Sequence, residues 1–405
     1  MRIGEFSNIN NVSIDAVRHY MDLGLVIPEK VGGHYFFDEK CTDNLNSILD
    51  LKNMGFTLTE IKTIFMFKSL GKLTNYEEDL YYKNLFLNKH KSIEIQIDEL
   101  LNIKDRLTKK IDLLNNKNEE SEALLGVNLN FLSILRCSKC QNQLTITEAN
   151  IRDNHIIDGK LHCSCKKEYL IESGILKVSE LKKEYENNFN MNYISNYITL
   201  TDISYLDTMK KNLELSSRKI SSFNLNNKVL LELGSGVGFF LRNIYEDLPD
   251  DCLYIAVDHD IDRHKFLKSV LERGNQKKNI LFICCDFLDI PIKNNSIDML
   301  LDISGTSNYS FDHEDFLLSR IDNYLKEDST LLGSYIVFKN FKNESLIEKK
   351  YRNNFLLDNI KNELNECKYN MIEDITSGYI DKGGKYENFF VHGEKIYNYV
   401  FYGKR

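Results

Sequence analysis

One stretch of the chain has residue types and a spacing that could bind a nucleotide-like ligand. Residues 229–240 read VLLELGSGVGFF, an apolar run followed by three glycines at alternate positions. Glycine lets the backbone turn sharply and approach a ligand closely. A nicotinamide-binding fingerprint needs a small residue three positions after its second glycine, but that position holds the bulky Phe239. No G-x-x-x-x-G-K run follows, which excludes an NTP-binding loop.

The apolar run before the glycines is the first of several expected strands. Others are expected in LYIAVDHD, NILFICCDFLDIP, SIDMLLDISG and STLLGSYIVF, with amphipathic stretches such as DIDRHKFLKSVLERG between them. Strands that alternate with helices predict a mostly parallel, doubly wound α/β sheet, whose ligand lies at the carboxyl ends of the strands. Asp258 lies at the end of the second expected strand. A carboxylate there can accept hydrogen bonds from both hydroxyls of a ribose.

The segment ELGSGVG resembles motif I of class I S-adenosylmethionine methyltransferases, and an acid ends the next strand, as in that family. The resemblance covers residues 220–340 and extends to KYNMIEDI and KIYNYVFYGK, which look like the strand pair that closes the family's sheet. It implies S-adenosylmethionine as cofactor, with Asp286 and Phe287 at the adenine edge. The cofactor-binding residues that it implies are Glu232, Gly234, Ser235, Gly236, Gly238, Asp258, His259, Asp286, Phe287 and Asp302.

No catalytic residue is assigned, because methyl transfer needs little beyond proximity and in-line geometry. The segment DISGTSNYS (302–310) lacks the N/D-P-P-Y run of enzymes that methylate amino groups of bases, which argues against base methylation. Cys284 and Cys285 lie inside an expected strand and are interpreted as core. The tyrosines of residues 191–209 could cap the cofactor as a lid or pack as core, and the sequence leaves both open.

Four of the nine cysteines gather within residues 137–165. The segments LRCSKCQNQL and LHCSCKKEYLIESGIL supply Cys137, Cys140, Cys163 and Cys165. Paired thiolates on two knuckles can close a tetrahedral zinc site, and four ligands without an open position indicate a structural ion. The ending KEYLIESGIL resembles that of small zinc ribbons ahead of some methyltransferases. Two alternatives stay open: His155 or His162 replaces one thiolate, or the thiols serve redox chemistry.

The first 75 residues predict short helices around a hairpin. Ser13 before IDAVRHYMDLGL reads as an N-cap and a helix that ends at Gly24. VGGHYFF (31–37) predicts the hairpin, and a second helix pair restarts after a cap at Thr57 or Thr59. A helix–turn–helix, a hairpin and another helix pair form a winged DNA-binding layout.

IGEFSNINNVSIDAVRHYMDLGLVIP resembles the opening helix–turn–helix of the MerR family of transcription regulators, GGHYFF its wing, and LDLKNMGFTLTEIKTIF its closing helix pair. The resemblance implies double-stranded DNA as a partner. The DNA-binding residues that it implies are Ser13, Arg18, His19, Tyr20, Gly33, His34 and Tyr35. The family usually has an arginine where this wing has Tyr35, and the segment is not basic, so weak or salt-sensitive binding is expected. A fold kept only for dimerisation is the alternative.

Residues 83–117 contain no glycine or proline and predict one long helix. Apolar residues recur along this helix at alternating spacings of four and three, and one of these positions is polar. Such a spacing is typical of a coiled-coil seam. The seam comprises Ile93, Ile97, Leu100, Lys104, Leu107, Ile111 and Leu114. Such a helix cannot bury its stripe alone, so a homodimer through residues 83–117 is expected, which matches the dimerisation helix of MerR-like proteins. The alternative is packing on the C-terminal domain of the same chain.

The whole chain has 405 residues, of which 42% are apolar and 28% charged, as in soluble globular proteins. Its net charge of −8 argues against general affinity for nucleic acid. The sequence has no secretory signal profile and no apolar run near the ~18 residues of a membrane span, so we expect a cytoplasmic protein. Four domains are expected: the winged helix–turn–helix (1–75), the α-helical coiled coil (76–120), a small β zinc ribbon (121–180) and the Rossmann-like methyltransferase sheet (181–405).

These features predict a dimeric MerR-like regulator that binds a promoter inverted repeat. Its methyltransferase domain would methylate or sense a small-molecule inducer. One alternative is a working S-adenosylmethionine-dependent enzyme on RNA or a small molecule, with an N-terminal domain used for dimerisation. Another is a regulator whose catalytically silent fold reports the level of the cofactor.

Overall fold

The computed structural model describes residues 1–115, 124–178, 192–274 and 276–405, which form two compact units, Met1–Glu119 and Glu120–Arg405. The expected domain boundaries at 120/121 and 180/181 lie outside the described residues, as do the last two positions of the predicted 83–117 helix and Met191 of the tyrosine-rich stretch. Within the described part of the chain, no helix is both long and apolar enough to cross a membrane.

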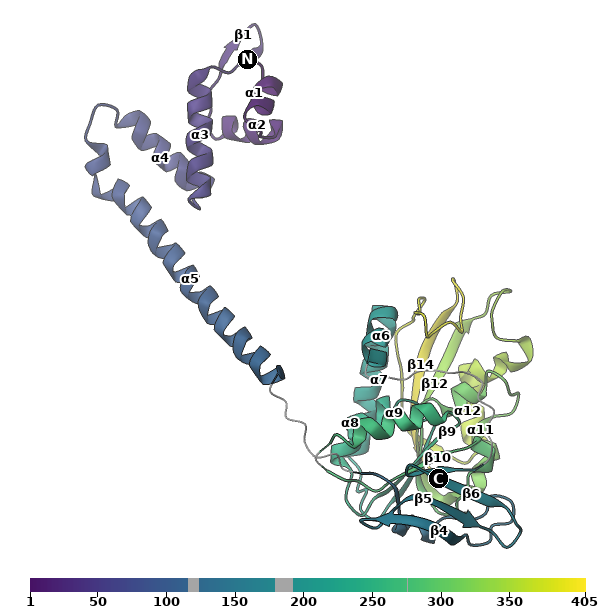
Figure 1. Ribbon diagram of the computed structural model, residues 1–405. Helices are drawn as coiled ribbons and strands as arrows, with labels where there is room; N and C mark the ends of the chain where they lie inside the picture. The colour runs from purple at the N-terminus through teal and green to yellow at the C-terminus, as the bar shows by residue number, and fades with distance from the viewer. Residues whose placement is uncertain (116–123, 179–191, 275) are drawn as a thin grey trace. The chain divides into compact units, whose positions relative to one another are not determined.

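The N-terminal unit consists of helices and one short hairpin (Figure 1). Its elements are α1 (Ile3–Ile9), α2 (Ile14–Asp22), β1 (Glu29–Val31), β2 (His34–Phe36), α3 (Glu39–Asn53), α4 (Leu58–Leu70) and α5 (Leu80–Asn115). Both predicted N-caps are confirmed. Ser13 Oγ accepts from Ala16 N at 3.1 Å, and Thr57 forms a reciprocal capping box with Glu60. Gly24 follows α2 at φ 71°, a conformation that favours glycine.

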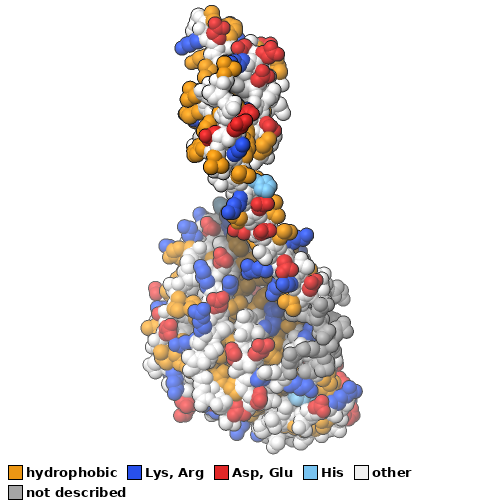
Figure 2. All heavy atoms as spheres, turned by 90° about the vertical axis from the view of Figure 1, so that its left-hand side faces the viewer, with side chains coloured by type: hydrophobic (Ala, Val, Ile, Leu, Met, Phe, Trp, Pro, Cys, Tyr) orange, Lys and Arg blue, Asp and Glu red, His pale blue; other side chains and the backbone are white. Residues whose placement is uncertain are grey.

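Helix α5 confirms the predicted long helix, and its side chains from residue 91 onward are exposed. Its first turns lie near α4, where Lys89 Nζ is 2.9 Å from Glu60 Oε2. No residue of α5 is buried, and every residue from 91 to 115 is exposed. Figure 2 shows apolar side chains interspersed with charged ones on the N-terminal unit. The predicted seam therefore runs along an exposed helix.

The C-terminal unit is built on one 12-stranded sheet in the order β13-β14-β12-β11-β8-β9-β10-β7-β6-β5-β3, with β4 paired to β5. The central strands are β8 (Val229–Leu233), β9 (Leu253–Asp258), β10 (Ile280–Cys284), β11 (Ile297–Asp302) and β12 (Leu325–Asn340). All five run parallel, and β14 (Lys395–Lys404) lies antiparallel between β12 and β13 (Asn370–Thr376). The predicted doubly wound sheet and its closing strand pair are confirmed.

Helices cover both faces of this sheet (Figure 1). They are α6 (Asn192–Leu200), α7 (Ile203–Ser221), α8 (Phe239–Ile244), α9 (Ile261–Leu271), α10 (Gly305–Tyr309), α11 (Leu317–Arg320) and α12 (Leu357–Glu366). The side chains of β8 alternate between two buried clusters, because successive residues of a strand face opposite sides. Leu230 packs with α7, α8 and α9, whereas Leu231 and Leu233 pack with α11 and α12.

The cysteine-rich segment continues the sheet of the C-terminal unit. Its strands are β3 (Val127–Asn128), β4 (Thr145–Arg152), β5 (His155–His162), β6 (Glu168–Glu172) and β7 (Ile175–Lys177). Strand β7 pairs in parallel with β10, with Ile175 opposite Phe282. Cys137 and Tyr169 lie in the same buried cluster as Leu231. The segment therefore shares both hydrogen bonds and a core with the Rossmann-like strands.

Candidate functional site

The glycine turn connects β8 to α8 in a conformation that few other residues adopt. Gly234, Gly236 and Gly238 have φ values of 68°, 53° and 76°. A Cβ at Gly238 would come within 2.1 Å of Leu267 Cδ1 on α9. Helix α8 begins at Phe239, directly after this turn. Because side chains strain this backbone or collide with α9, the spacing of the glycines follows from local geometry.

Asp258, the last residue of β9, holds the glycine turn against the sheet. Its carboxylate is buried, and Oδ2 accepts a 2.8 Å hydrogen bond from Gly236 N, while Oδ1 accepts from Asp260 N at 2.9 Å. Arg263 Nη1 lies 4.0 Å from Oδ2. The carboxylate therefore positions the turn through backbone donors, a role beyond the ribose contact that the sequence predicted.

A cavity of about 380 Å³ opens at the carboxyl ends of β8 and β11. Its walls come from the glycine turn, α6, α7, α10, the strands β12 and β14, and the segment 377–394. Of the predicted cofactor residues, those on the wall are Glu232, Gly234, Ser235 and Gly236. The others, Gly238, Asp258, His259, Asp286, Phe287 and Asp302, are not part of the wall. The strand order reverses at β8, which is where open α/β sheets bind ligands.

Two buried carboxyl groups have raised pKa values. Burial raises the pKa of the Glu232 carboxyl to about 8, although Tyr254 Oη donates a 2.9 Å hydrogen bond to it. Burial also raises the pKa of Asp302 to about 6, against a 2.8 Å hydrogen bond from Thr306 N. Glu232 lines the cavity, so a cationic ligand group there would favour its ionised form.

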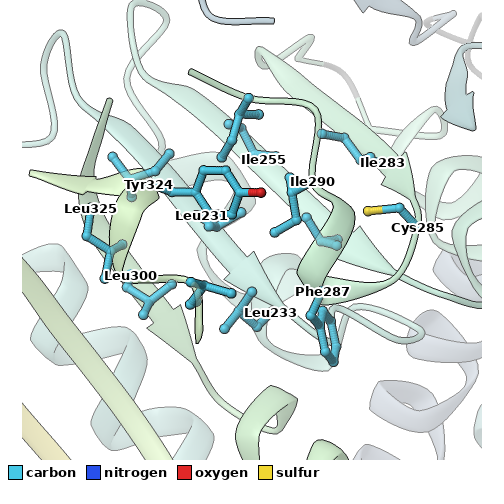
Figure 3. Packing of buried hydrophobic residues seen from close by; sticks show 14 of the residues in the cluster. Leu231, Leu233, Ile255, Ile283, Cys285, Phe287, Ile290, Leu300, Tyr324 and Leu325 are labelled. Atoms are coloured by element: carbon cyan, nitrogen blue, oxygen red, sulfur yellow. The ribbon is translucent and has the colours of Figure 1, made fainter. Parts of the chain in front are cut away.

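The predicted adenine-edge residues are not part of the cavity wall. Asp286 is exposed and its Oδ1 accepts from Leu288 N at 2.8 Å, which caps a short 3-10 helix. Phe287 is 9% exposed and packs in the cluster that contains Leu233 and Ile290 (Figure 3). His259 is exposed, and its Nδ1 lies 3.7 Å from Asp258 Oδ1.

The tyrosine-rich stretch lines the cavity. Tyr193, Tyr197 and Tyr205 form part of its wall, so these rings face the space in which a ligand would lie. Sequence reasoning missed the adjoining part of the wall, which includes Tyr386, Glu387 and Phe389, because a connection between two strands has no periodic pattern. The dense run YENFF was the one available signal.

The four cysteines form one cluster whose Sγ atoms all lie within 4.8 Å of one another. Sγ–Sγ distances are 3.5 Å for Cys137 and Cys165 and 3.3 Å for Cys140 and Cys163. These are contacts between free thiols. His155 Nδ1 lies 2.8 Å from Asp153 O, and His162 Nδ1 lies 3.4 Å from Glu168 Oε1, so both imidazoles have other partners. The donor set fits a tetrahedral metal ion such as Zn²⁺.

The predicted DNA-binding residues lie on α2 and the hairpin. Exposed positions are Ser13, Arg18, His19, Gly33, His34 and Tyr35. Tyr20 is 4% exposed and belongs to the core, with its Oη 3.4 Å from Lys52 Nζ. Arg18 pairs with Asp15 at 3.3 Å in an exposed ion pair, and Lys30 Nζ lies 5.4 Å from the centre of the Tyr35 ring. The hairpin thus carries a cation, Lys30, although Tyr35 occupies the wing position where the MerR family usually has an arginine.

Family models match both ends of the described architecture. One described as MerR HTH family regulatory protein matches residues 1–67, and one described as Methyltransferase domain matches residues 224–396. The chain is 29% identical over 128 residues to nodulation protein NolA of Bradyrhizobium diazoefficiens, covering 31% of this chain and 46% of that protein. NolA of Bradyrhizobium elkanii is 30% identical over 108 residues, with coverages of 26% and 44%. The chain therefore spans less than half the length of these relatives.

Two solved structures show lower similarity. A S-adenosylmethionine-dependent methyltransferase from Aquifex aeolicus is 15% identical, with a TM-score of 0.34 and coverages of 52% of this chain and 97% of that chain. Phosphoethanolamine N-methyltransferase 2 of Haemonchus contortus is 12% identical, with a TM-score of 0.33 and coverages of 47% and 52%. These two structures carry no assignment for this chain. The assignment of the domains depends on the family models and on the sheet topology. Both predicted resemblances are confirmed: the chain combines a MerR-type helix–turn–helix domain with a methyltransferase domain.

Proposed function

We propose that this protein is a MerR-like DNA-binding regulator whose C-terminal domain binds S-adenosylmethionine and methylates or senses a small-molecule inducer. The observation that carries the proposal is the glycine turn, which Asp258 fixes beside a cavity at the switch point of the sheet. A MerR-type domain on the same chain favours a regulator over an enzyme alone.

The cavity offers groups that suit the polar parts of this cofactor. Two buried atoms on its wall have no hydrogen-bond partner within the described structure, Ser235 Oγ and Asn212 Nδ2. A buried polar group without a partner is costly, so a ligand that pairs with it gains affinity. Glu232 can receive the cofactor's ammonium group, and the turn around Gly236 can approach its methionine portion. When bound, the cofactor supplies an activated methyl group.

The residues around the cavity would orient this ligand and exclude water from it. Tyr197 is buried and its ring lies 5.2 Å from that of Phe239, at the start of α8. Tyr193 lies 6.3 Å from Phe266 on α9. Helix α6 thus covers the two helices that follow the predicted cofactor-binding turns. We assign no catalytic acid or base, because orientation can supply most of what methyl transfer requires.

The N-terminal unit would bind duplex DNA as a homodimer. Two copies joined through the exposed part of α5 would present two α2 helices and two hairpins to the half-sites of an inverted repeat. Arg18, Lys30 and His34 are among the exposed groups that could contact phosphates. The four-cysteine cluster would hold a structural zinc ion, and we place the protein in the cytoplasm, where DNA and the cofactor are present.

Isothermal titration calorimetry with S-adenosylmethionine tests the cofactor assignment. Asp258→Ala removes the acceptor of the Gly236 and Asp260 amides, so we expect binding to be lost. Asp262→Ala is the matched control, because it removes an acid on the neighbouring helix α9 while the Gly236 and Asp260 amides keep Asp258 as their acceptor. Unchanged affinity in Asp258→Ala would remove the assignment.

A gel-retardation assay at low salt separates the regulator from an enzyme that uses its N-terminal domain only for dimerisation. The probe is a fragment with an inverted repeat from the protein's own promoter. We expect retardation that weakens steeply with salt, since phosphate contacts release counterions. No retardation at low salt would favour the enzyme alone.

A further inference from the structure

The cavity contains a buried carboxylate that no cation among the described residues neutralises. Glu387, in the segment 377–394, is 4% exposed and lines the cavity. Its Oε2 accepts a 3.0 Å hydrogen bond from Gly384 N. Within the described chain, no Lys, Arg or His nitrogen lies within 4.0 Å of this carboxylate. Buried charges in proteins are normally paired, because removing an isolated ion from water is costly.

Aromatic rings line the cavity together with this carboxylate. The rings of Tyr197 and Tyr386 lie 5.3 Å apart, and that of Tyr193 lies 5.6 Å from Tyr386. On the same wall, Phe311 and Phe389 lie 5.4 Å apart. The faces of aromatic rings attract cations, most strongly where water is excluded.

The wall is held in place by close backbone packing. A Cβ at Gly384 would come within 2.3 Å of Leu200 O and 2.4 Å of Thr201 Cα, so only glycine lets the segment approach the junction of α6 and α7. Lys385 N donates to Leu200 O at 3.2 Å. Burial and then the Glu387 carboxylate raise the pKa of the Tyr197 hydroxyl, which agrees with their proximity. Glu387 and the tyrosines therefore form one preformed surface.

Charge on the wall favours a cation over an anion. The wall has two carboxyl groups, Glu232 and Glu387, and one guanidinium, Arg263. Arg263 already pairs with two acids, since its Nε lies 3.4 Å from Asp260 Oδ2 and its Nη1 4.0 Å from Asp258 Oδ2. An anionic ligand would meet an unpaired carboxylate and a cation that is already neutralised.

We propose that Glu387 and the tyrosines around it bind the positively charged nitrogen of a second small-molecule ligand, an organic amine or ammonium compound. The inference rests on the proposed function, because it places the acceptor or inducer beside the cofactor. It assigns Glu387 as the counter-ion, and Tyr386 and Tyr197 as the aromatic faces. Asn212 Nδ2, which has no partner within the described structure, would donate to an oxygen of a ligand in the same cavity.

Calorimetry on the full chain with choline as a probe tests this site. The neutral compound 3,3-dimethylbutan-1-ol has nearly the same shape, so comparing the two isolates the charge. Both are titrated with and without S-adenosylhomocysteine. We expect choline to bind at least tenfold more tightly than the alcohol. Equal affinities, or no choline binding under either condition, would overturn the inference.

Variants of the segment 377–394 test which side chain supplies the negative charge that binds choline. Glu387→Gln keeps an oxygen acceptor for Gly384 N, and we expect it to weaken choline binding at least tenfold while S-adenosylhomocysteine binding is unchanged. Asp381→Asn makes the same charge change at an exposed position of the segment, and choline binding should not change. Tyr386→Leu should weaken choline binding, and Tyr386→Phe, which keeps the ring, should preserve it. Unchanged choline affinity in Glu387→Gln would refute the role of the carboxylate.

The cofactor's own sulfonium is the competing occupant. If Tyr386→Leu weakens S-adenosylmethionine but not S-adenosylhomocysteine, and choline does not bind, the wall serves the cofactor and the inference fails while the proposed function stands. Failure of both nucleosides to bind would overturn the proposed function instead. Choline titrated alone keeps these two failures apart.

Discussion

The two units differ in the kind of surface that each leaves without a partner. In the N-terminal unit this surface is apolar and exposed, with Ile97, Leu100 and Leu107 each at least half exposed on α5. In the C-terminal unit the central strands are buried on both faces, and the wall of a cavity contains polar groups with which a ligand could pair, such as the Glu387 carboxylate and Asn212 Nδ2. An extended apolar stripe fits another macromolecule, whereas a small polar cavity fits a small molecule. Different partners are thus expected for the two units.

The test with the largest expected effect on stability removes the metal ion that we expect in the C-terminal unit. Cys163→Ser or chelation should lower the free energy of unfolding by about 3 kcal/mol or more, or roughly 10 °C in the midpoint. The loss should extend into the sheet, because Cys137 and Cys163 share a core with Leu231 and β7 pairs with β10.

Thermal unfolding and elemental analysis of bound zinc check this expectation. Ser164→Ala changes the residue between two of the thiolates and is the control, with metal content retained. A C-terminal unit that unfolds at the same temperature with and without zinc would show that the cysteine cluster contributes nothing to the sheet.

The second test concerns the exposed apolar stripe of α5 in the N-terminal unit. Leu100→Glu places a charge in the predicted seam of α5, and we expect dimerisation to weaken at least tenfold, or about 1.4 kcal/mol or more. Analytical ultracentrifugation measures the association. Asn102→Glu adds the same charge away from the seam and should leave the dimer intact. Monomers in the unaltered protein would contradict this role of α5.

Much of this organisation could be predicted from the sequence because it depends on local patterns. The caps at Ser13 and Thr57, the long helix and the five central strands follow from spacing and residue type. The joining of β7 to β10 could not be predicted, because three residues pair in parallel with a strand about a hundred positions away. The pairing of two strands so far apart in the sequence can be predicted only when the topology of the sheet is known.

The site was predicted in part for the same reason. The glycine turn and Asp258 lie together as expected, because successive parallel strands end at one edge of the sheet. Phe287 lies in the core instead of on the cavity wall, which its position after Asp286 did not reveal. Glu387 entered the site through a long connection whose path depends on tertiary packing against α6 and α7.

The third test concerns pH and the Glu232 carboxyl. Its pKa of about 8 in the folded state lies above the ordinary value of 4.5, so the folded state binds more protons and this group's contribution to stability falls as pH rises between those values. The ammonium group of the cofactor would bind to Glu232 only when this carboxyl group is ionised. Affinity for S-adenosylhomocysteine should therefore rise from pH 6 to 8, by up to about tenfold per unit. Calorimetry with Glu232→Gln should show a flat profile, and the same slope in both proteins would exclude Glu232 as the cause.

The smallest expected effect separates folding from DNA recognition within the N-terminal unit. Ser13→Ala and Thr57→Ala each remove an N-cap, and each should cost about 1 kcal/mol of stability in urea unfolding. The two caps differ in place, since Ser13 precedes the predicted recognition helix α2 and Thr57 precedes α4. Only Ser13→Ala should also weaken DNA retardation, by roughly threefold to tenfold for one lost contact. Equal DNA affinities in the two variants would mean that Ser13 stabilises the helix without touching DNA, and the recognition surface would then have to be sought in Arg18, His19 and the hairpin.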